Sequence, residues 1–274
     1  MNPATRRYLE AFALLIVWMA AGWSFDLGPN EYLLAGVPLI VVFQLFVRRK
    51  PLRDLWVRDS AAFSVGLYGW VIALALAVKP VFELYRTLAR ELWVPSAWMV
   101  CAAAGALPAA FAIRHQSGTK LVRALPSFVV AIVLGLAVMA ASSLAHGGYL
   151  LFPSGQVSYF LGQFLLYFVV GFVLEEVAFR GAIDSHLYHA DGPDRAPAAA
   201  WLSAVVVSVL WGIWHLPLLG THDFGRLIAS APTLIFAHVV IGVPLSFCWR
   251  TGGTLLLPAI AHAIIEAYRN VVLF

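Results

Sequence analysis

A series of long apolar stretches is the feature that most restricts the fold of this chain. A helix needs roughly 20 apolar residues to cross the hydrocarbon core of a bilayer. The stretches that meet this requirement lie approximately at residues 8–25, 32–47, 61–81, 92–113, 125–145, 158–183, 198–219, 228–249 and 254–274. None of them shows the alternation typical of a β-strand. The sequence therefore predicts an all-α fold, a polytopic transmembrane helix bundle of about eight or nine spans.

The composition agrees with a membrane protein. Hydrophobic residues make up 62% of the chain and charged residues 12%, whereas a soluble domain has about 45–50% apolar and about 25% charged residues. So much apolar surface cannot be buried in one soluble core. The net charge is only +4, and the basic residues gather at the ends of the apolar segments, as topology signals do. No nucleic-acid partner is expected.

The distribution of basic residues predicts the orientation of the bundle. Arg6 and Arg7 precede the first segment, and further Lys and Arg residues follow the second and fourth segments. The loops at 26–31 and 146–157 contain neither Lys nor Arg. Under the positive-inside rule this pattern predicts a multi-pass protein of the cell (inner) membrane with a cytoplasmic N-terminus. Residues 51–59 mix apolar and charged side chains, so they either lie flat on the membrane surface or form a plain basic loop.

A charged cluster interrupts the apolar sequence near residue 175. The sequence Glu-Glu-Val-Ala-Phe-Arg-Gly at residues 175–181 directly follows an apolar run. Charged side chains at this depth cost at least a few kcal/mol each and usually mark a functional site. Glu176 and Arg180 are four residues apart, so on a helix they share a face and can form an ion pair. Glu175 is then the freer carboxylate and suits a general base that activates water. The alternatives are a salt bridge that locks two helices and a helix end at the membrane interface.

Two histidines in later segments are candidates for the same site. His215 lies late in the seventh segment, and His262 lies in the last segment with Glu266 and Arg269 on the same helical face. The turns at 189–197 and 251–253 bound these segments. At 1.5 Å per residue, Glu175, His215 and His262 lie about 20, 27 and 15 Å from those turns, so they can meet near the middle of the membrane.

Other polar or aromatic side chains in these segments favour structural roles. A lone histidine in an apolar helix is more often a packing residue than a catalyst. His238 either lines the same cavity or bonds a backbone carbonyl group, and the second is favoured. Trp211 is expected to pack in the bundle or anchor it at the membrane interface.

The order of these elements resembles the CPBP family, which comprises the type II CaaX prenyl endopeptidases and their bacterial relatives, the Abi proteins. The resemblance rests on Glu-Glu-x-x-x-Arg, then an aromatic residue four before His215, and then His262 four before a polar residue after an Arg-Thr-Gly turn. It covers approximately residues 160–266. It implies that residues 151–274 form a CPBP-like catalytic helix bundle. Residues 1–150 lie outside the resemblance and are expected to form N-terminal transmembrane helices that act as a scaffold, a substrate gate or a partner surface.

The resemblance also implies a role for each matching residue. Glu175 would be the base that activates the attacking water, and Glu176 and Arg180 would hold the geometry and charge of the site. His215 would position or protonate that water. His262 would help to stabilise the oxyanion of the tetrahedral intermediate.

Two positions depart from the family pattern. Trp211 stands where the family usually has Phe, and Glu266 stands where it usually has Asn or sometimes Asp. An ionised Glu cannot donate a hydrogen bond to an oxyanion. Three explanations remain open: Glu266 is protonated, it orients His262, or the oxyanion hole is built differently.

The sequence thus predicts an intramembrane endopeptidase without a cofactor. A Glu-activated water would cleave a membrane-anchored or lipidated protein near its C-terminal membrane segment, in contact with membrane lipids. One alternative is a zinc-dependent peptidase with His215, His262 and Glu175 or Glu266 as ligands, although the usual His-Glu-x-x-His helix is absent. Another is a non-enzymatic membrane immunity or scaffold protein. A transporter is less favoured, because no half-to-half repeat is visible.

Overall fold

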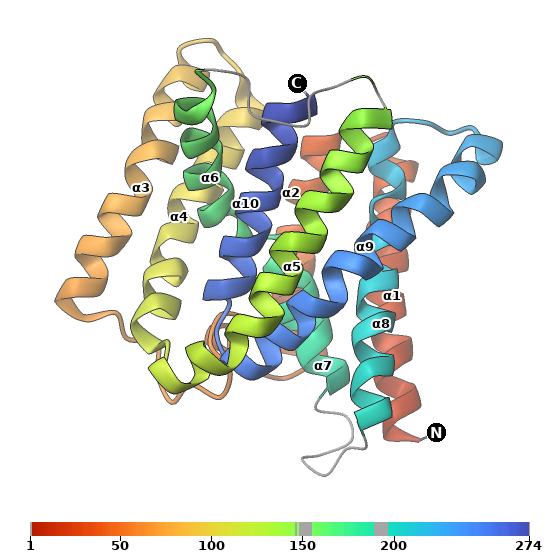
Figure 1. Ribbon diagram of the computed structural model, residues 1–274, viewed down its shortest axis with the longest axis horizontal. Helices are drawn as coiled ribbons and strands as arrows, with labels where there is room; N and C mark the ends of the chain where they lie inside the picture. The colour runs from red at the N-terminus through yellow and green to blue at the C-terminus, as the bar shows by residue number, and fades with distance from the viewer. Residues whose placement is uncertain (1, 146, 148–154, 189–196, 274) are drawn as a thin grey trace.

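The chain forms a bundle of helices, and within the described residues it contains no β-strand. A computed structural model describes residues 2–145, 147, 155–188 and 197–273. The N-terminus and the C-terminal helix end lie at opposite ends of the bundle (Figure 1). The α-helices are α1 (Pro3–Ser24), α2 (Pro29–Val42), α3 (Gly66–Leu88), α4 (Trp93–His115), α5 (Gly118–Ala145), α6 (Val157–Gly171), α7 (Ser185–Tyr188), α8 (Pro197–Trp214), α9 (Phe224–Gly252) and α10 (Leu256–Leu273). Short helices of other types are η1 (Phe43–Val47), η2 (Leu52–Leu55), η3 (Val177–Asp184) and η5 (Leu216–Leu219).

Within the described residues, seven helices are long and apolar enough to cross a membrane. They are Pro29–Val47, Gly66–Leu88, Trp93–His115, Gly118–Ala145, Pro197–Leu219, Phe224–Gly252 and Leu256–Leu273. The predicted all-α polytopic bundle is thereby confirmed. Two predicted spans are not among the seven, namely those that became α1 and α6. The predicted turn at 189–197 lies outside the described residues apart from Pro197, and so does most of the predicted loop at 146–157.

The predicted continuous span at 158–183 is broken in two, which corrects the sequence analysis. α6 ends at Gly171, and the N–H groups of Phe172 and Val173 bond the carbonyls three residues back, at 3.1 and 2.9 Å. Such bonds tighten and end an α-helix. The carbonyl of Phe172 instead accepts a hydrogen bond from Trp56 Nε1 at 2.8 Å. The helix starts again at Glu175 and continues through η3 and α7, so its positive N-terminal end lies at the two carboxylates.

The segment at 51–59 is part of the core, so neither of the two predicted surface arrangements describes it. Leu55 and Val57 are only 2% and 6% exposed. Val57 forms an isolated β-bridge with Thr254 between α9 and α10. The apolar side chains that predicted membrane contact are used to pack this segment into the bundle.

Three connections meet at the N-terminal end of the bundle. The N–H group of Arg58 donates to the carbonyl of Gly253 at 2.9 Å, and Thr254 hydrogen-bonds Gln116 in the link between α4 and α5. The predicted turn at 251–253 is present, since α9 ends at Gly252 and Gly253 has φ +74°. Most of the basic loops therefore gather at one end of the bundle. Which side of the membrane this end faces stays a prediction.

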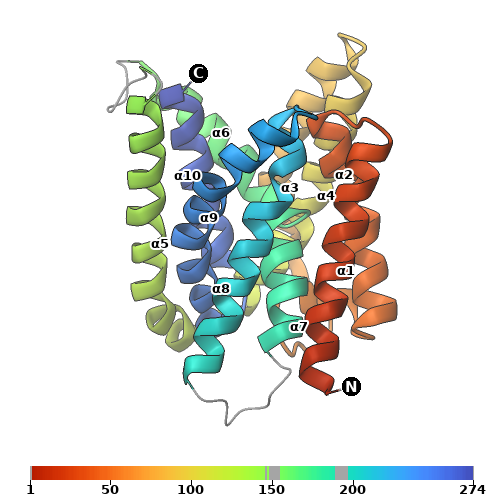
Figure 2. The ribbon, with the colours of Figure 1, turned by 90° about the vertical axis from the view of Figure 1, so that its right-hand side faces the viewer.

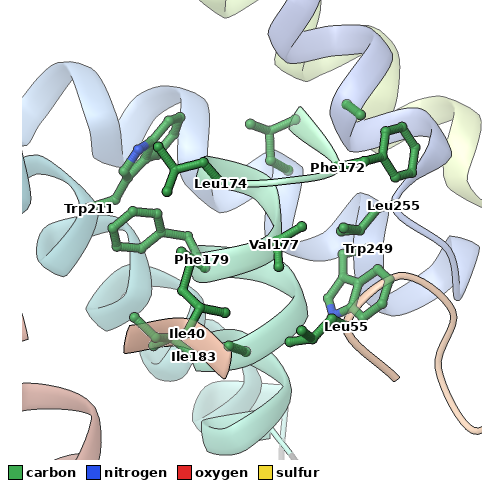
Figure 3. Packing of buried hydrophobic residues seen from close by; sticks show 14 of the residues in the cluster. Ile40, Leu55, Phe172, Leu174, Val177, Phe179, Ile183, Trp211, Trp249 and Leu255 are labelled. Atoms are coloured by element: carbon green, nitrogen blue, oxygen red, sulfur yellow. The ribbon is translucent and has the colours of Figure 1, made fainter. Parts of the chain in front are cut away.

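Gly181 allows η3 to pack directly against the segment at 51–59. Figure 3 shows the buried hydrophobic side chains around η3, with Leu55 and Trp249 on one side and Phe179 and Trp211 on the other. A Cβ atom added at Gly181 would lie 2.3 Å from the carbonyl oxygen of Leu55. The carbonyl of Gly181 itself accepts a hydrogen bond from Arg48 Nη1 at 2.8 Å. The last residue of the charged motif therefore has a packing reason to be glycine.

We expect Gly181→Ala to destabilise the folded protein, because the new methyl group meets a backbone atom that cannot move freely. Overpacking of this kind costs about 1–3 kcal/mol. The thermal unfolding temperature of purified protein in detergent should fall by several degrees. Gly118→Ala is the matched control, since a Cβ there meets nothing within 4 Å. Equal unfolding temperatures for the two variants would contradict the packing argument.

Candidate active site

Glu176 is the buried anchor of the charged cluster. Its side chain is 1% exposed, and its Oε1 atom lies 2.8 Å from Nδ1 of His262 in α10. Its Oε2 atom lies 3.5 Å from Nε of Arg180, which confirms the ion pair expected from the four-residue spacing. One carboxylate thus connects the interrupted helix to the last helix of the chain.

Arg180 neutralises Glu176 without forming a hydrogen-bonded clamp. Its side chain is fully buried, and none of its guanidinium nitrogens has a hydrogen-bond acceptor among the described residues. The guanidinium carbon lies 4.9 Å from the ring centroid of Trp211, a cation–π distance. The cation therefore acts on the site through its charge and its stacking.

Glu175 projects toward both candidate histidines and is 23% exposed. Its Oε2 atom lies 3.7 Å from Nε2 of His215 and 3.8 Å from Nε2 of His262. Nδ1 of His215 lies 2.9 Å from the carbonyl oxygen of Trp211. A carbonyl can only accept, so this nitrogen carries a proton. When the ring is neutral, Nε2 is an acceptor, and it is the atom that faces Glu175. The structure thus brings together Glu175, His215 and His262, as the estimated depths predict.

Trp211 contacts more of the site than the sequence analysis expects. It is buried, as a packing residue would be, and its ring lies edge-on to those of His215, His238 and His262 at 5.9, 4.7 and 5.4 Å. Its Nε1 atom also donates a hydrogen bond to Oε2 of Glu175 at 3.0 Å. Phenylalanine has no such donor. The departure from Phe at this position was the signal in the sequence that could have identified Trp211 as part of the site.

His238 bonds the carbonyl of Leu234 through Nδ1 at 2.7 Å, which confirms the expected backbone contact. Its ring also lies 4.0 Å from the ring of His215, centroid to centroid. His238 therefore packs directly against His215.

Glu266 lies at the edge of the cluster and is paired with Arg269. Two guanidinium nitrogens of Arg269 approach its two carboxylate oxygens at 3.0 and 2.6 Å. Its nearest approach to Nε2 of His262 is 4.0 Å. Arg269 also contacts Asn270, whose amide donates to Tyr167 in α6 at 3.2 Å. Glu266 is thus part of a polar network along one side of α10, with its charge compensated inside the same helix.

A cavity of about 230 Å³ opens on this cluster. Glu175 and His262 form its polar end, and the rest of its wall is contributed by α2, α4 and α6. Its lining residues are Asn30, Leu33, Pro95, Trp98, Met99, Leu166, Tyr167, Val170, Gly171, Leu174, Glu175 and His262. The least buried carboxylate of the motif therefore faces a mostly apolar space between helices.

Across the described part of the chain, no group of three His, Cys, Asp or Glu side chains is arranged to hold a metal ion. The predicted zinc ligands do lie near one another, as the distances from Glu175 to His215 and His262 show. The zinc alternative stays a prediction that metal analysis of purified protein can test.

Comparison with known proteins supports the resemblance found in the sequence. The model of the family described as Type II CAAX prenyl endopeptidase Rce1-like matches residues 157–268. No curated protein and no solved structure matches the chain. The matched region runs from the first residue of α6 into α10. Of the site residues described above, it contains Glu175, Glu176, Arg180, Trp211, His215, His238, His262 and Glu266, and it ends just before Arg269. The helices that build this site, residues 157–268 of a multi-pass membrane protein, are thus similar to the Type II CAAX prenyl endopeptidase Rce1-like family.

Proposed function

We propose that the chain is an intramembrane endopeptidase of the glutamic type. Glu175 would activate a water molecule that cleaves a membrane-anchored or lipidated protein near its C-terminal membrane segment. The single observation that carries the proposal is the position of the Glu175 carboxylate. It is partly exposed at the end of a cavity, and it lies within 4 Å of Nε2 of both His215 and His262.

The residues around Glu175 support a complete hydrolytic step. Glu175 takes one proton from water while the water oxygen attacks the carbonyl carbon of the peptide bond. Nε2 of His262, when protonated, donates to the oxyanion of the tetrahedral intermediate. The proton held by Glu175 then passes to the amide nitrogen as the C–N bond breaks. The products are a carboxylic acid and an amine, and Glu175 returns to its ionised form.

The remaining charged groups hold the two reacting side chains in place. Glu176 accepts from Nδ1 of His262 and so directs Nε2 toward the reacting atoms, as an acidic partner does for many catalytic histidines. Arg180 compensates the buried charge of Glu176. Nε2 of His215 accepts a hydrogen bond from the attacking water. In this scheme Glu266 is not an oxyanion donor, because both of its oxygens are occupied by Arg269.

The cavity supports a substrate that approaches from within the membrane. Its apolar wall between α2, α4 and α6 suits an aliphatic or lipid-modified segment, while its polar end suits a peptide bond. We place the protein in the cell (inner) membrane. The basic end of the bundle, which includes the N-terminus, would then face the cytoplasm.

Replacement of Glu175 by Gln should abolish peptide cleavage, because the amide keeps the size of the side chain and removes the base. General-base catalysis contributes about 10²- to 10⁴-fold to such reactions. Wild type and variant would be expressed in membranes, and C-terminal fragments of membrane-anchored proteins would be compared by mass spectrometry. Glu91→Gln, at an exposed position between α3 and α4, is the matched control.

Metal analysis of the same purified protein would test the zinc alternative.

If wild type and Glu175→Gln give the same fragments while the variant still inserts normally, the peptidase proposal is wrong. A non-enzymatic scaffold or immunity role would then be the better explanation.

Trp211→Phe should lower kcat with little change in KM, because it removes the donor that orients Glu175 and keeps an aromatic ring in the core. Losing a hydrogen bond to a charged group costs about 1.5–3 kcal/mol, which is roughly a 10- to 100-fold loss of rate. The control is Trp214→Phe, one turn further along α8, because the Nε1 atom of Trp214 has no acceptor among the described residues. Equal loss of activity in both variants would indicate that only ring volume matters.

Arg269→Gln should impair cleavage by leaving Glu266 as an uncompensated, partly buried carboxylate beside His262. The double variant Glu266→Gln/Arg269→Gln removes both charges and should recover much of the lost activity, which a double-mutant cycle with the two single variants would measure. Additive losses in the double variant would show that the two residues act independently, against the pairing proposed here.

A further inference from the structure

A second and larger cavity lies away from the proposed active site. Its volume is about 420 Å³, and it is formed by the start of α1, the segment that follows α2, and α7. Figure 2 shows α7 beside the N-terminal part of α1 at the N-terminal end of the bundle. The cavity shares no lining residue with the cavity at Glu175. The proposed peptidase mechanism does not use it.

The side chains that line this second cavity carry an excess of positive charge. The basic ones are Arg6, Arg7, Arg48, Lys50 and Arg58, and the acidic ones are Glu10, Asp54 and Asp59. Glu10 is already occupied, since it accepts from Arg6 Nε at 2.7 Å and lies 2.8 Å from Nε2 of His186. Asp54 is also partly compensated from outside the cavity, since its Oδ1 atom lies 4.0 Å from Nε of Arg53, which is not a lining residue. The acidic side chains therefore offset only part of the basic charge.

Two of the cations are left for a ligand. Neither the Arg7 nor the Lys50 side chain takes part in an ion pair or a side-chain hydrogen bond among the described residues. Arg48, in contrast, is fixed in place because its Nη1 atom donates to Gln44 Oε1 at 2.6 Å and to the carbonyl of Gly181 at 2.8 Å. A fixed guanidinium beside two unpaired cations is the arrangement that recognises a phosphate group.

Exposed apolar side chains lie close in sequence to residues that line this cavity. Leu9 on α1 is 54% exposed and lies three residues after the lining residue Arg6. Phe46, next to the lining residue Val47, is 71% exposed. Exposed apolar residues near a basic cavity are a reason to include anionic lipids among the ligands that are tested.

We propose that this cavity binds a phosphate-bearing anion, either the headgroup of an anionic membrane phospholipid or a soluble phosphate ester. Arg7 and Lys50 supply the unpaired charges, and Arg48 supplies the fixed donor. Ser185 and His186 also line the cavity, and they lie in α7, the last part of the helix that carries Glu176 and Arg180. The ligand would therefore bind against the far end of the helix that begins at the proposed active site.

The test compares two sources of phosphate with matched charge variants. Purified protein would be placed in phosphatidylcholine nanodiscs with added phosphatidylglycerol, and bound lipid would be counted by native mass spectrometry. Binding of glycerol phosphate in solution would be measured separately by calorimetry. The variants are Lys50→Gln and Arg7→Gln/Lys50→Gln. Arg49→Gln is the control, because it removes the same charge at the next residue, which is exposed and does not line the cavity.

We expect the affinity of the double variant for at least one of the two probes to be at least about tenfold lower than that of wild type. The affinity of Arg49→Gln should equal that of wild type. Preference for phosphatidylglycerol over phosphatidylcholine identifies a lipid site, and binding of glycerol phosphate alone identifies a soluble phosphate ester. The proposal is overturned if neither probe binds, or if Arg49→Gln weakens binding as much as Lys50→Gln does. Unfolding temperatures would confirm that the exposed substitutions leave the fold intact.

Discussion

The buried carboxylate of Glu176 is the group on which the arrangement of the site depends. An unpaired charge in this position would be prohibitively costly, so the surrounding structure has to compensate it. His262 bonds one oxygen at 2.8 Å, and Arg180 lies 3.5 Å from the other. Because these partners come from α10 and from the next turn of the same helix, satisfying one charge fixes two helices relative to each other. The same contact sets the direction in which His262 presents Nε2.

The break between α6 and η3 places that carboxylate in the interior. A continuous helix over 158–183 would keep one direction through residue 175, without the change in chain path that the break allows. The bonds of Phe172 and Val173 end α6, and the indole of Trp56 satisfies the carbonyl that the break exposes. A new helix then begins at Glu175, and its positive end favours both carboxylates. The segment at 51–59 therefore has a structural role in the site although it contributes no group to the chemistry.

Trp211 connects the buried Glu176–Arg180 pair to the partly exposed carboxylate of Glu175. Its ring lies against Arg180 and the histidines, and its N–H group holds Glu175 at the cavity. One face of a single side chain thus packs against a cation while its edge donates to an anion, in agreement with the charge distribution of an indole ring. The site consequently has a dry part around Glu176 and Arg180 and an open part at Glu175. Hydrolysis needs both parts, because the dry part holds the charged side chains in place while the open part admits water.

The sequence by itself determined the helical, membrane-embedded class of the chain, the Glu176–Arg180 pair and the depths at which Glu175, His215 and His262 can meet. These follow from apolar segment length, from the periodicity of a helix and from its rise per residue, all of which are local properties. The division of the chain at about residue 150 and the roles of the site residues stay predictions. Only the tertiary structure decided that α6 is interrupted, that Leu55 is buried, that Trp211 binds Glu175 and that Arg269 compensates Glu266. Three of these four features depend on contacts between segments distant in sequence, and the fourth, within α10, depends on a choice of side-chain conformation that spacing alone does not determine.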